Sequence, residues 1–168
     1  MSWRCFIGIG ANLGDPVATV RQAIAELRRL PQSNFVAASS LYRTAAIGLR
    51  DQPDFINAVV ELLTVSSAPT LLQALMAIEQ RHGRQRSVKN APRTLDLDLL
   101  LYGDKLSADP YLTLPHPRLH ERAFVLAPLA ELAPTLTIPH HGPVRELLAA
   151  CSDQTIAPLY AIDQFAAA

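Results

Sequence analysis

The stretch at positions 93–103, RTLDLDLLLYG, alternates acidic and leucine side chains. It is short and ends at a Tyr-Gly pair, so the pattern predicts a strand rather than a helix. On a strand, Asp96 and Asp98 share one face. The opposite face then carries the leucines that can enter a hydrophobic core, namely Leu95, Leu97, Leu99 and Leu101.

Five other segments before position 93 have clear patterns of apolar and polar residues. Strands are expected at 3–12, 34–44 and 55–65, and helices at 16–30 and 68–83. Asp15 and Pro16 are typical of the N-cap and first position of a helix. The resulting order, βαββαβ, is typical of a ferredoxin-like core, so we expect an α+β fold with an antiparallel sheet and helices.

The chain after Leu106 is rich in proline and has weaker patterns. We expect helices at 120–134 and 143–151 and a short strand at 136–139, which together form a C-terminal extension of the core. The sequence has no internal repeat and no linker that divides it. We therefore expect one domain over residues 1–168, with a peripheral tail from about position 161.

Composition narrows the classes of function. The 168 residues carry no formal net charge, 49% of them are hydrophobic and 18% are charged. A neutral chain lacks the basic footprint that nucleic-acid or membrane-surface binding needs, so neither partner is expected. Cys5 and Cys151 form no CxxC pair, and two isolated thiols suit the cytoplasm. Neither a signal peptide nor a bilayer-spanning run is evident, and oligomeric state stays open, with a monomer favoured.

The two acids of the fourth strand raise the question of what they face. Asp96 and Asp98 lie about 6.5–7 Å apart along a strand, so their carboxylates can converge on cations between them. Hard oxygen ligands favour Mg²⁺ over zinc. Arg86 and Arg93 lie just upstream, and acids next to arginines suggest a metal-bound polyphosphate. The simpler alternative, a solvated edge strand beside a solvated basic loop, stays open on these residues alone.

Three further groups of residues are candidates for function. Gly8, Gly10 and Gly14 have GxGxxxG spacing, which does not match a dinucleotide fingerprint and favours a tight turn or a close backbone approach. His116 and His120 lack an obvious third zinc ligand, so a phosphate contact is the better interpretation. Asn57 is either a polar residue of a strand end or an amide that recognises a heterocycle.

The chain closely resembles the 6-hydroxymethyl-7,8-dihydropterin pyrophosphokinases of folate biosynthesis. The resemblance extends over nearly the whole chain, through GIGANLGD, LYRTAAIG, DQPDFINAV, EQRHGRQR, KNAPRTLDLDLLLYG and LPHPRLHERAFVLAPLAELAP. It implies a ferredoxin-like α+β core and a reaction that moves the β,γ-pyrophosphoryl unit of ATP onto the pterin hydroxymethyl group and releases AMP. Two Mg²⁺ ions are expected with ATP.

The resemblance also implies roles for individual residues. The catalytic residues would be Arg84, Arg93, Asp96 and Asp98, of which the two aspartates would bind the metal. Besides the two arginines, the ATP site would include Glu79, Arg86, Leu99, Leu112, His116 and Arg122. The pterin site would include Thr44, Ile47, Phe55, Asn57 and Phe124, with the two phenylalanines on either side of the ring.

The sequence departs from the family pattern at two loops. Asn90-Ala91 replaces a Trp-Gly pair of some relatives, and Ala45-Ala46 replaces Pro-Pro, so the second loop should be less rigid. The general base stays open between a hydroxyl with a metal-lowered pKa and Asp96. Two alternatives also stay open: a metal-dependent nucleotide pyrophosphatase, and a ferredoxin-like binding module for RNA or a small effector.

Overall fold

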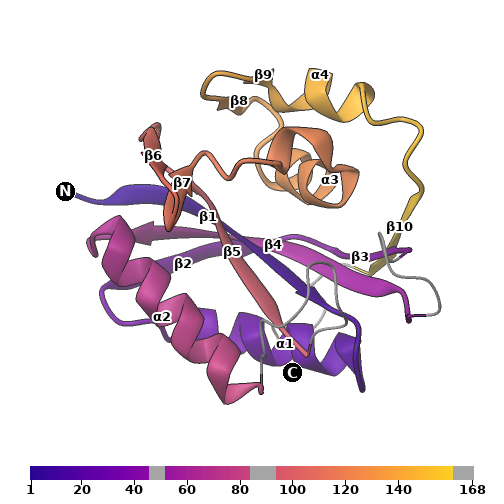
Figure 1. The fold of residues 1–168 in the computed structure, drawn as a ribbon, viewed down its shortest axis with the longest axis horizontal. Coiled ribbons are helices and arrows are strands. Elements are labelled where there is room, and N and C mark those ends of the chain that lie inside the picture. Colours follow the sequence, from indigo (N-terminus) through magenta and orange to yellow (C-terminus); the bar gives the residue numbers. More distant parts are fainter. Residues whose placement is uncertain (46–51, 84–93, 161–168) are drawn as a thin grey trace.

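An antiparallel sheet separates two helical layers in this protein (Figure 1). The computed structural model describes residues 1–45, 52–83 and 94–160, and six strands of these residues form the sheet. Its order is β10-β3-β4-β1-β5, and β2 also pairs with β4. Every pairing in it is antiparallel. The bounds are β1 (Trp3–Ala11), β2 (Ser33–Ala38), β3 (Leu41–Thr44), β4 (Phe55–Thr64), β5 (Asp96–Tyr102) and β10 (Ile156–Tyr160).

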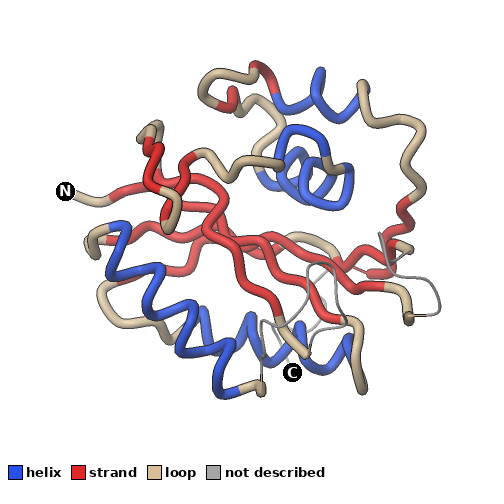
Figure 2. The backbone as a smooth tube through the Cα atoms, viewed as in Figure 1, coloured by secondary structure: helices blue, strands red, loops and turns tan. Residues whose placement is uncertain are grey.

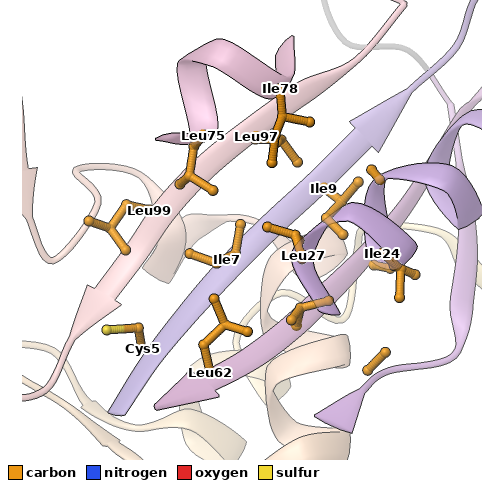
Figure 3. Packing of buried hydrophobic residues seen from close by; sticks show 14 of the residues in the cluster. Cys5, Ile7, Ile9, Ile24, Leu27, Leu62, Leu75, Ile78, Leu97 and Leu99 are labelled. Atoms are coloured by element: carbon orange, nitrogen blue, oxygen red, sulfur yellow. The ribbon is translucent and has the colours of Figure 1, made fainter. Parts of the chain in front are cut away.

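The first helical layer consists of α1 (Pro16–Arg28) and α2 (Ala68–Arg81). Each helix begins at a side-chain cap: Asp15 accepts a hydrogen bond from the Ala18 N–H, and Ser67 accepts one from the Thr70 N–H. Their apolar faces pack on the odd-numbered positions of β1 and on Leu97 and Leu99 of β5. Figure 3 shows this first core, which includes Ile7, Ile9, Ile24, Leu27, Leu75, Ile78, Leu97 and Leu99.

The second helical layer covers the opposite face of the sheet (Figure 2). It consists of η1 (Leu119–Glu121), α3 (Ala123–Leu132) and α4 (Val144–Ala149). Val125, Leu126 and Leu129 pack against Phe6 and other buried residues in a second core. Two short hairpins complete the structure: β6 (Ser107–Asp109) with β7 (Leu112–Leu114), and β8 (Thr137–Ile138) with β9 (Gly142–Pro143).

The predicted mixed α/β fold with an antiparallel sheet is confirmed, but the expected strand at 34–44 is two strands. The break between β2 and β3 has a local cause. Ser39 bonds to Val59 through its backbone N–H, its hydroxyl accepts from the Val59 N–H at 2.9 Å, and the same hydroxyl donates to the Ser40 carbonyl at 2.8 Å. A serine side chain thus takes the place of a backbone group and interrupts the strand.

The expectation that Leu101 shares a face with Leu97 and Leu99 is wrong. The register between β1 and β5 shifts after Leu99, where Ile7 pairs with Leu99 and Phe6 pairs with Leu101. The extra residue, Leu100, turns the rest of the strand over. Leu100 and Leu101 therefore both enter the second core, while Leu95, Leu97 and Leu99 stay in the first.

The region after position 105 differs most from the expectations. The helix expected at 120–134 is a short η1 followed by α3, while the strand near 136–139 and the last helix are present as β8 and α4. The β6–β7 hairpin, β9 and β10 were not predicted. These strands have two to five residues, too few for a period-two pattern to stand out. No helix in the described part of the chain has the length and apolar character needed to cross a membrane.

Candidate active site

The two acids of β5 lie on the side of the sheet that carries α3. Asp96 pairs with Gly10 and Asp98 with Gly8 on the neighbouring strand. Both aspartates are half-buried, whereas Leu97 between them is only 2% exposed and belongs to the first core. The period-two alternation therefore separates carboxylates from leucines up to Leu99, which is why this strand can be buried on one face and hold charges on the other.

Glycines of β1 allow side chains of the neighbouring strands to approach the backbone next to these acids. A Cβ atom at Gly10 would lie 3.1 Å from Asn57 Oδ1 and 3.9 Å from the Phe55 ring. Phe55 and Asn57 therefore lean over Gly10 from β4, on the same face as the acids of β5. Gly10 thus permits a close approach, and Gly14, with φ of 64°, forms the turn before α1.

Asn57 has a fixed orientation on β4. Its amide nitrogen donates to Thr44 Oγ1 at 2.8 Å, and both residues are less than 10% exposed. Phe55 pairs with Thr44 across β3 and β4 and is half-buried. The amide has two donors and two acceptor sites in total, so one bond to Thr44 uses only part of its capacity. A rigid amide beside an aromatic ring suits the edge and face of a flat heterocycle.

The segment before α3 brings a histidine to the acids. The His116 N–H donates to the Leu100 carbonyl at 2.9 Å, and His116 Nε2 lies 4.0 Å from Asp98 Oδ1. Burial and the charge of Arg122 lower the pKa of His116 to about 4, although Asp96 acts in the opposite direction. The imidazole is therefore neutral near pH 7. Arg122 in turn lies over the Phe124 ring, with its Cζ 5.5 Å from the centroid.

Glu79 of α2 is hydrogen-bonded to the backbone of β5, the strand that carries the two aspartates. Its carboxylate is 2% exposed and accepts a hydrogen bond from the Leu97 N–H at 2.8 Å. Leu97 lies between the two aspartates, so this bond fixes the backbone that carries them. Leu99 is 4% exposed in the first core, and Leu112 packs against the same core. Leu99 is therefore part of the first core and Leu112 borders it, so neither side chain lies on the face that carries the acids.

Several predicted site residues lie outside the described residues. They are Ile47, Arg84, Arg86 and Arg93, together with the departures at Ala46 and Asn90-Ala91. Among the residues that the structure does describe, no group of three or more His, Cys, Asp and Glu side chains could hold a metal ion. Two carboxylates are a fitting donor set for Mg²⁺, which commonly takes one or two carboxylates and completes its shell with substrate phosphates and water.

The role of Gly10 was not anticipated beyond a general close approach. Gly10 lies opposite Asp96 on one neighbouring strand and opposite Asn57 on the other, and this placement can be recognised only once the strand register is known. A second unanticipated feature is Glu131 of α3, whose carboxylate bonds to Ser40 and Tyr42 at the break between β2 and β3.

Sequence comparisons with known proteins match this chain over most of its length. The sequence profile of the family described as 7,8-dihydro-6-hydroxymethylpterin-pyrophosphokinase matches residues 6–134. The chain is 45% identical over 151 residues to the 2-amino-4-hydroxy-6-hydroxymethyldihydropteridine pyrophosphokinase of Pseudomonas aeruginosa, covering 90% of this chain and 93% of that protein. The Haemophilus influenzae protein of the same name is 38% identical over 154 residues, covering 92% and 96%.

Solved structures show a similar fold. The chain matches an HPPK-DHPS structure in complex with substrates with a TM-score of 0.70 at 12% identity. The match covers 91% of this chain and 44% of that one. The match to wild-type Plasmodium falciparum HPPK-DHPS has a TM-score of 0.67 at 14% identity and covers 89% and 41%. The chain thus spans less than half the length of these two proteins, and at such identities the likeness concerns the fold alone.

Proposed function

This chain belongs to the 7,8-dihydro-6-hydroxymethylpterin-pyrophosphokinase family, and from that premise we propose which of its side chains hold each substrate. The family transfers pyrophosphate from ATP to 6-hydroxymethyl-7,8-dihydropterin in folate biosynthesis, so the chain is an ATP-dependent diphosphotransferase. One observation carries the assignment of the site. Acids on β5 and an amide with an aromatic ring on β4 flank the glycines of β1 on one face of the sheet.

Asp96 and Asp98 are our proposed magnesium ligands. An ATP-using kinase generally requires Mg²⁺, and we propose that these two carboxylates hold two ions together with ATP phosphates and water. Their position on one face of β5, half-buried and beside glycines, supports this. Bound there, the metal supplies charge neutralisation for the triphosphate and a lower pKa for a coordinated hydroxyl. Glu79 would act indirectly, by holding the Leu97 backbone between the two ligands.

The remaining nucleotide contacts are proposed on chemical grounds. Arg84, Arg86 and Arg93 would neutralise the phosphates, with Arg84 and Arg93 closest to the reaction. His116 and Arg122 would add contacts beside Asp98, which is supported by the 4.0 Å distance from His116 to Asp98. Leu99 and Leu112 would form the apolar adenine slot. The Leu99 side chain packs in the first core, so its contact with adenine would lie at the free edge of β5, which is the last strand in the sheet order.

The pterin would bind over Gly10. Phe55 and Phe124 would stack on its two faces, and Asn57 would bond to its polar edge. Thr44 would contribute by holding the Asn57 amide, which is supported by their 2.8 Å hydrogen bond, and Ile47 by a backbone contact. The hydroxymethyl group would then point toward the acids of β5, which is supported by the position of Gly8 and Gly10 between the two groups of side chains.

The transfer follows from positioning. The pterin hydroxyl oxygen forms a bond to the β-phosphorus, the bond from that phosphorus to the α-phosphate bridging oxygen breaks, and AMP leaves with the electron pair. Asp96 is a carboxylate able to receive the hydroxyl proton. Arg84 and Arg93 would stabilise the charge that develops on the leaving α-phosphate. His116 is neutral near pH 7 and could donate a hydrogen bond without adding charge.

The direct test is to incubate the protein with Mg-ATP, with and without the reduced pterin, and to separate AMP from ADP. We expect AMP only when the pterin is present. ADP as the main product would contradict pyrophosphoryl transfer, and AMP without pterin would favour the nucleotide pyrophosphatase. If neither nucleotide appears and the pterin still binds, the binding-module alternative gains support.

Four properties of the chain as a whole belong to the same proposal. We infer a ferredoxin-like core, supported by the order β5-β1-β4 followed by the interrupted β2 and β3. We also propose that residues 1–168 act as one domain and that the protein is a monomer, which sedimentation can test. A cytoplasmic location is supported by Cys5 and Cys151, which are both free and buried.

A further inference from the structure

We propose that Glu131 is a positioning residue for the pterin side of the site, and that it acts through Ser40 and Tyr42. Glu131 lies near the end of α3, the helix that also carries Phe124. The proposal rests on the pterin assignment of Phe55, Asn57 and Phe124 made above. Glu131 touches neither substrate. It sets the distance between β4, which carries Phe55 and Asn57, and α3, which carries Phe124.

Four hydrogen bonds join Glu131 to the sheet. The Ser40 N–H donates to both carboxylate oxygens, at 2.9 and 3.1 Å, and the Ser40 hydroxyl donates to Oε2 at 3.0 Å. The Tyr42 hydroxyl donates to Oε1 at 2.7 Å. All four are charge-assisted, and the two short bonds to Ser40 and Tyr42 hold different oxygens of one carboxylate. The group is thus fixed in both position and rotation relative to β3.

The sheet side of this contact leads directly to the pterin residues. Tyr42 lies opposite Asn57 in the register of β3 and β4, and Thr44 lies opposite Phe55. Tyr42 and Thr44 are two positions apart on a strand, so they share one face. Thr44 is the residue that accepts from the Asn57 amide. A shift of β3 relative to α3 would therefore move the acceptor that orients Asn57.

The helix side of this contact leads to Phe124. Phe124 and Glu131 are seven positions apart on α3, which is close to two full turns, so they lie on the same side of the helix about 10 Å apart. Between them, Val125, Leu126 and Leu129 pack in the second core. Apolar contact alone is non-directional and permits small sliding, whereas hydrogen bonds define a direction. Glu131 therefore fixes the helix end that is remote from Phe124, and with it the tilt of the Phe124 end.

Glu131 is exposed to solvent, which limits its effect on stability. Burial, the hydrogen bond to Glu131 and its charge all raise the pKa of Tyr42, so the phenol stays a donor throughout the neutral range. An exposed contact that contributes little to stability but keeps four bonds between two substrate-bearing elements is suited to alignment. This separates the proposal from a purely structural role.

The experiment compares Glu131→Ala, Glu131→Gln and Tyr42→Phe with Glu146→Gln. Glu146 is an exposed acid of α4 whose side chain makes no hydrogen bond to the described residues, so its variant controls for loss of a surface charge. AMP release is measured while pterin and Mg-ATP are varied in turn, and pterin affinity is measured separately by titration. The melting temperature of each variant is recorded.

We expect Glu131→Ala to raise the pterin KM and Kd roughly five- to tenfold, as for loss of a charged hydrogen-bond acceptor, and to leave the Mg-ATP KM within about twofold. Tyr42→Phe and Glu131→Gln should have smaller effects in the same direction, because each keeps part of the network. Glu146→Gln should match the wild type.

Two results would overturn the proposal. One is an unchanged pterin KM and Kd in Glu131→Ala, and the other is an equal rise for both substrates together with a lower melting temperature. If Glu131→Ala does not fold, Tyr42→Phe removes a single hydroxyl and decides the question. Failure of the proposed pterin site would be recognised differently, because the wild type itself would then neither bind the pterin nor release AMP.

Discussion

The two faces of the central sheet are built by the same strands but serve different purposes. The face toward α1 and α2 carries only apolar side chains from β1, such as Ile7 and Ile9, which pack in the first core (Figure 3). The face toward α3 is apolar at Phe6 and then continues through Gly8 and Gly10. At the glycines, the neighbouring strands provide carboxylates and an amide instead of a core.

This difference shows how one strand can serve stability and chemistry together. Alternation assigns each residue to one face, so a substitution on the first face changes packing, and one on the second face near the glycines changes the site. The polar residues of the second face cost little in packing, because the second core contains Phe6, Val59 and Leu100 of this sheet but neither the acids of β5 nor Asn57. Substitutions on the two faces should therefore have different effects.

The largest effect is expected from the acids of β5. Asp96→Ala and Asp98→Ala should each lower turnover by orders of magnitude, because each removes a proposed metal ligand. The fold should survive, since both side chains are half-buried and on the face away from the first core. Leu97→Ala, between them, should do the reverse: it should lower the free energy of unfolding by about 2–5 kcal/mol and largely retain turnover below its melting temperature.

The measurement is turnover against Mg²⁺ concentration together with chemical denaturation of all three variants. Near-normal activity of an aspartate variant at low Mg²⁺ would remove that residue from the metal site. A large loss of unfolding free energy in Asp96→Ala or Asp98→Ala would show that the two faces are not separate.

The next effect concerns pterin recognition. Asn57→Ala should weaken pterin binding by about 1–3 kcal/mol, because a buried amide loses its bonds to both the ring and Thr44. Phe55→Ala and Phe124→Ala should act in the same direction by removing stacking area. Affinity for an ATP analogue should stay nearly unchanged, since the nucleotide is proposed to bind on the Asp96 side.

Calorimetric titration with each ligand tests this division within the second face. If Asn57→Ala and Phe124→Ala lose nucleotide affinity and keep pterin affinity, the assignment of the two halves is wrong.

How far the sequence predicts this molecule can be judged residue by residue. The cap at Asp15 and the alternation around Asp96 are local signals, and local signals identified most elements of the core. Leu101 was assigned to the wrong face because a register shift depends on the partner strand, which the sequence of β5 alone does not contain. The strand at 34–44 is broken where the Val59 N–H donates a hydrogen bond to the Ser39 hydroxyl, again a contact between distant segments.

The candidate site divides in the same way. The spacing of Asp96 and Asp98 predicts their common face, and family resemblance predicts that Asn57 and Phe124 belong with them. The approach of His116 to Asp98 and the bonds of Glu131 to β3 could not be predicted, because they join segments 18 and about 90 positions apart through the fold. The alternation of residues predicts which face a side chain occupies as long as the strand is regular, and tertiary structure decides which residues the side chain contacts there.

A smaller effect is expected when a methyl group is added at Gly10. Gly10→Ala places a methyl group 3.1 Å from Asn57 Oδ1, so the amide must shift by a few tenths of an ångström. We expect a pterin KM higher by roughly tenfold, comparable to the loss of one good hydrogen bond. Gly8→Ala is the matched control, since its methyl would meet only the Leu100 side chain at 3.4 Å. Equal pterin KM values for the two variants would remove Asn57 as the cause.

The smallest effect concerns the layer of α3 and α4 in acid. The rings of His120 and His141 stack with centroids 3.8 Å apart and planes at 9°, and within the described residues His120 Nδ1 is buried without a hydrogen-bond partner. Burial, followed by His120 and His140, lowers the pKa of His141 below its ordinary 6.5, while Glu121 acts in the opposite direction.

A lowered folded-state pKa means that the unfolded chain binds the proton more readily. The stability that His141 contributes is therefore present above about pH 6.5 and decreases as the pH falls below it. His141→Asn should flatten this part of the stability curve, whereas His140→Asn, at an exposed position with φ of 66°, should weaken the pH dependence only in part, because burial and His120 still lower the pKa of His141. Denaturation of both variants from pH 7.5 to 5 provides the measurement. Parallel curves for His141→Asn and the wild type would show that the stacked pair does not make this layer acid-sensitive.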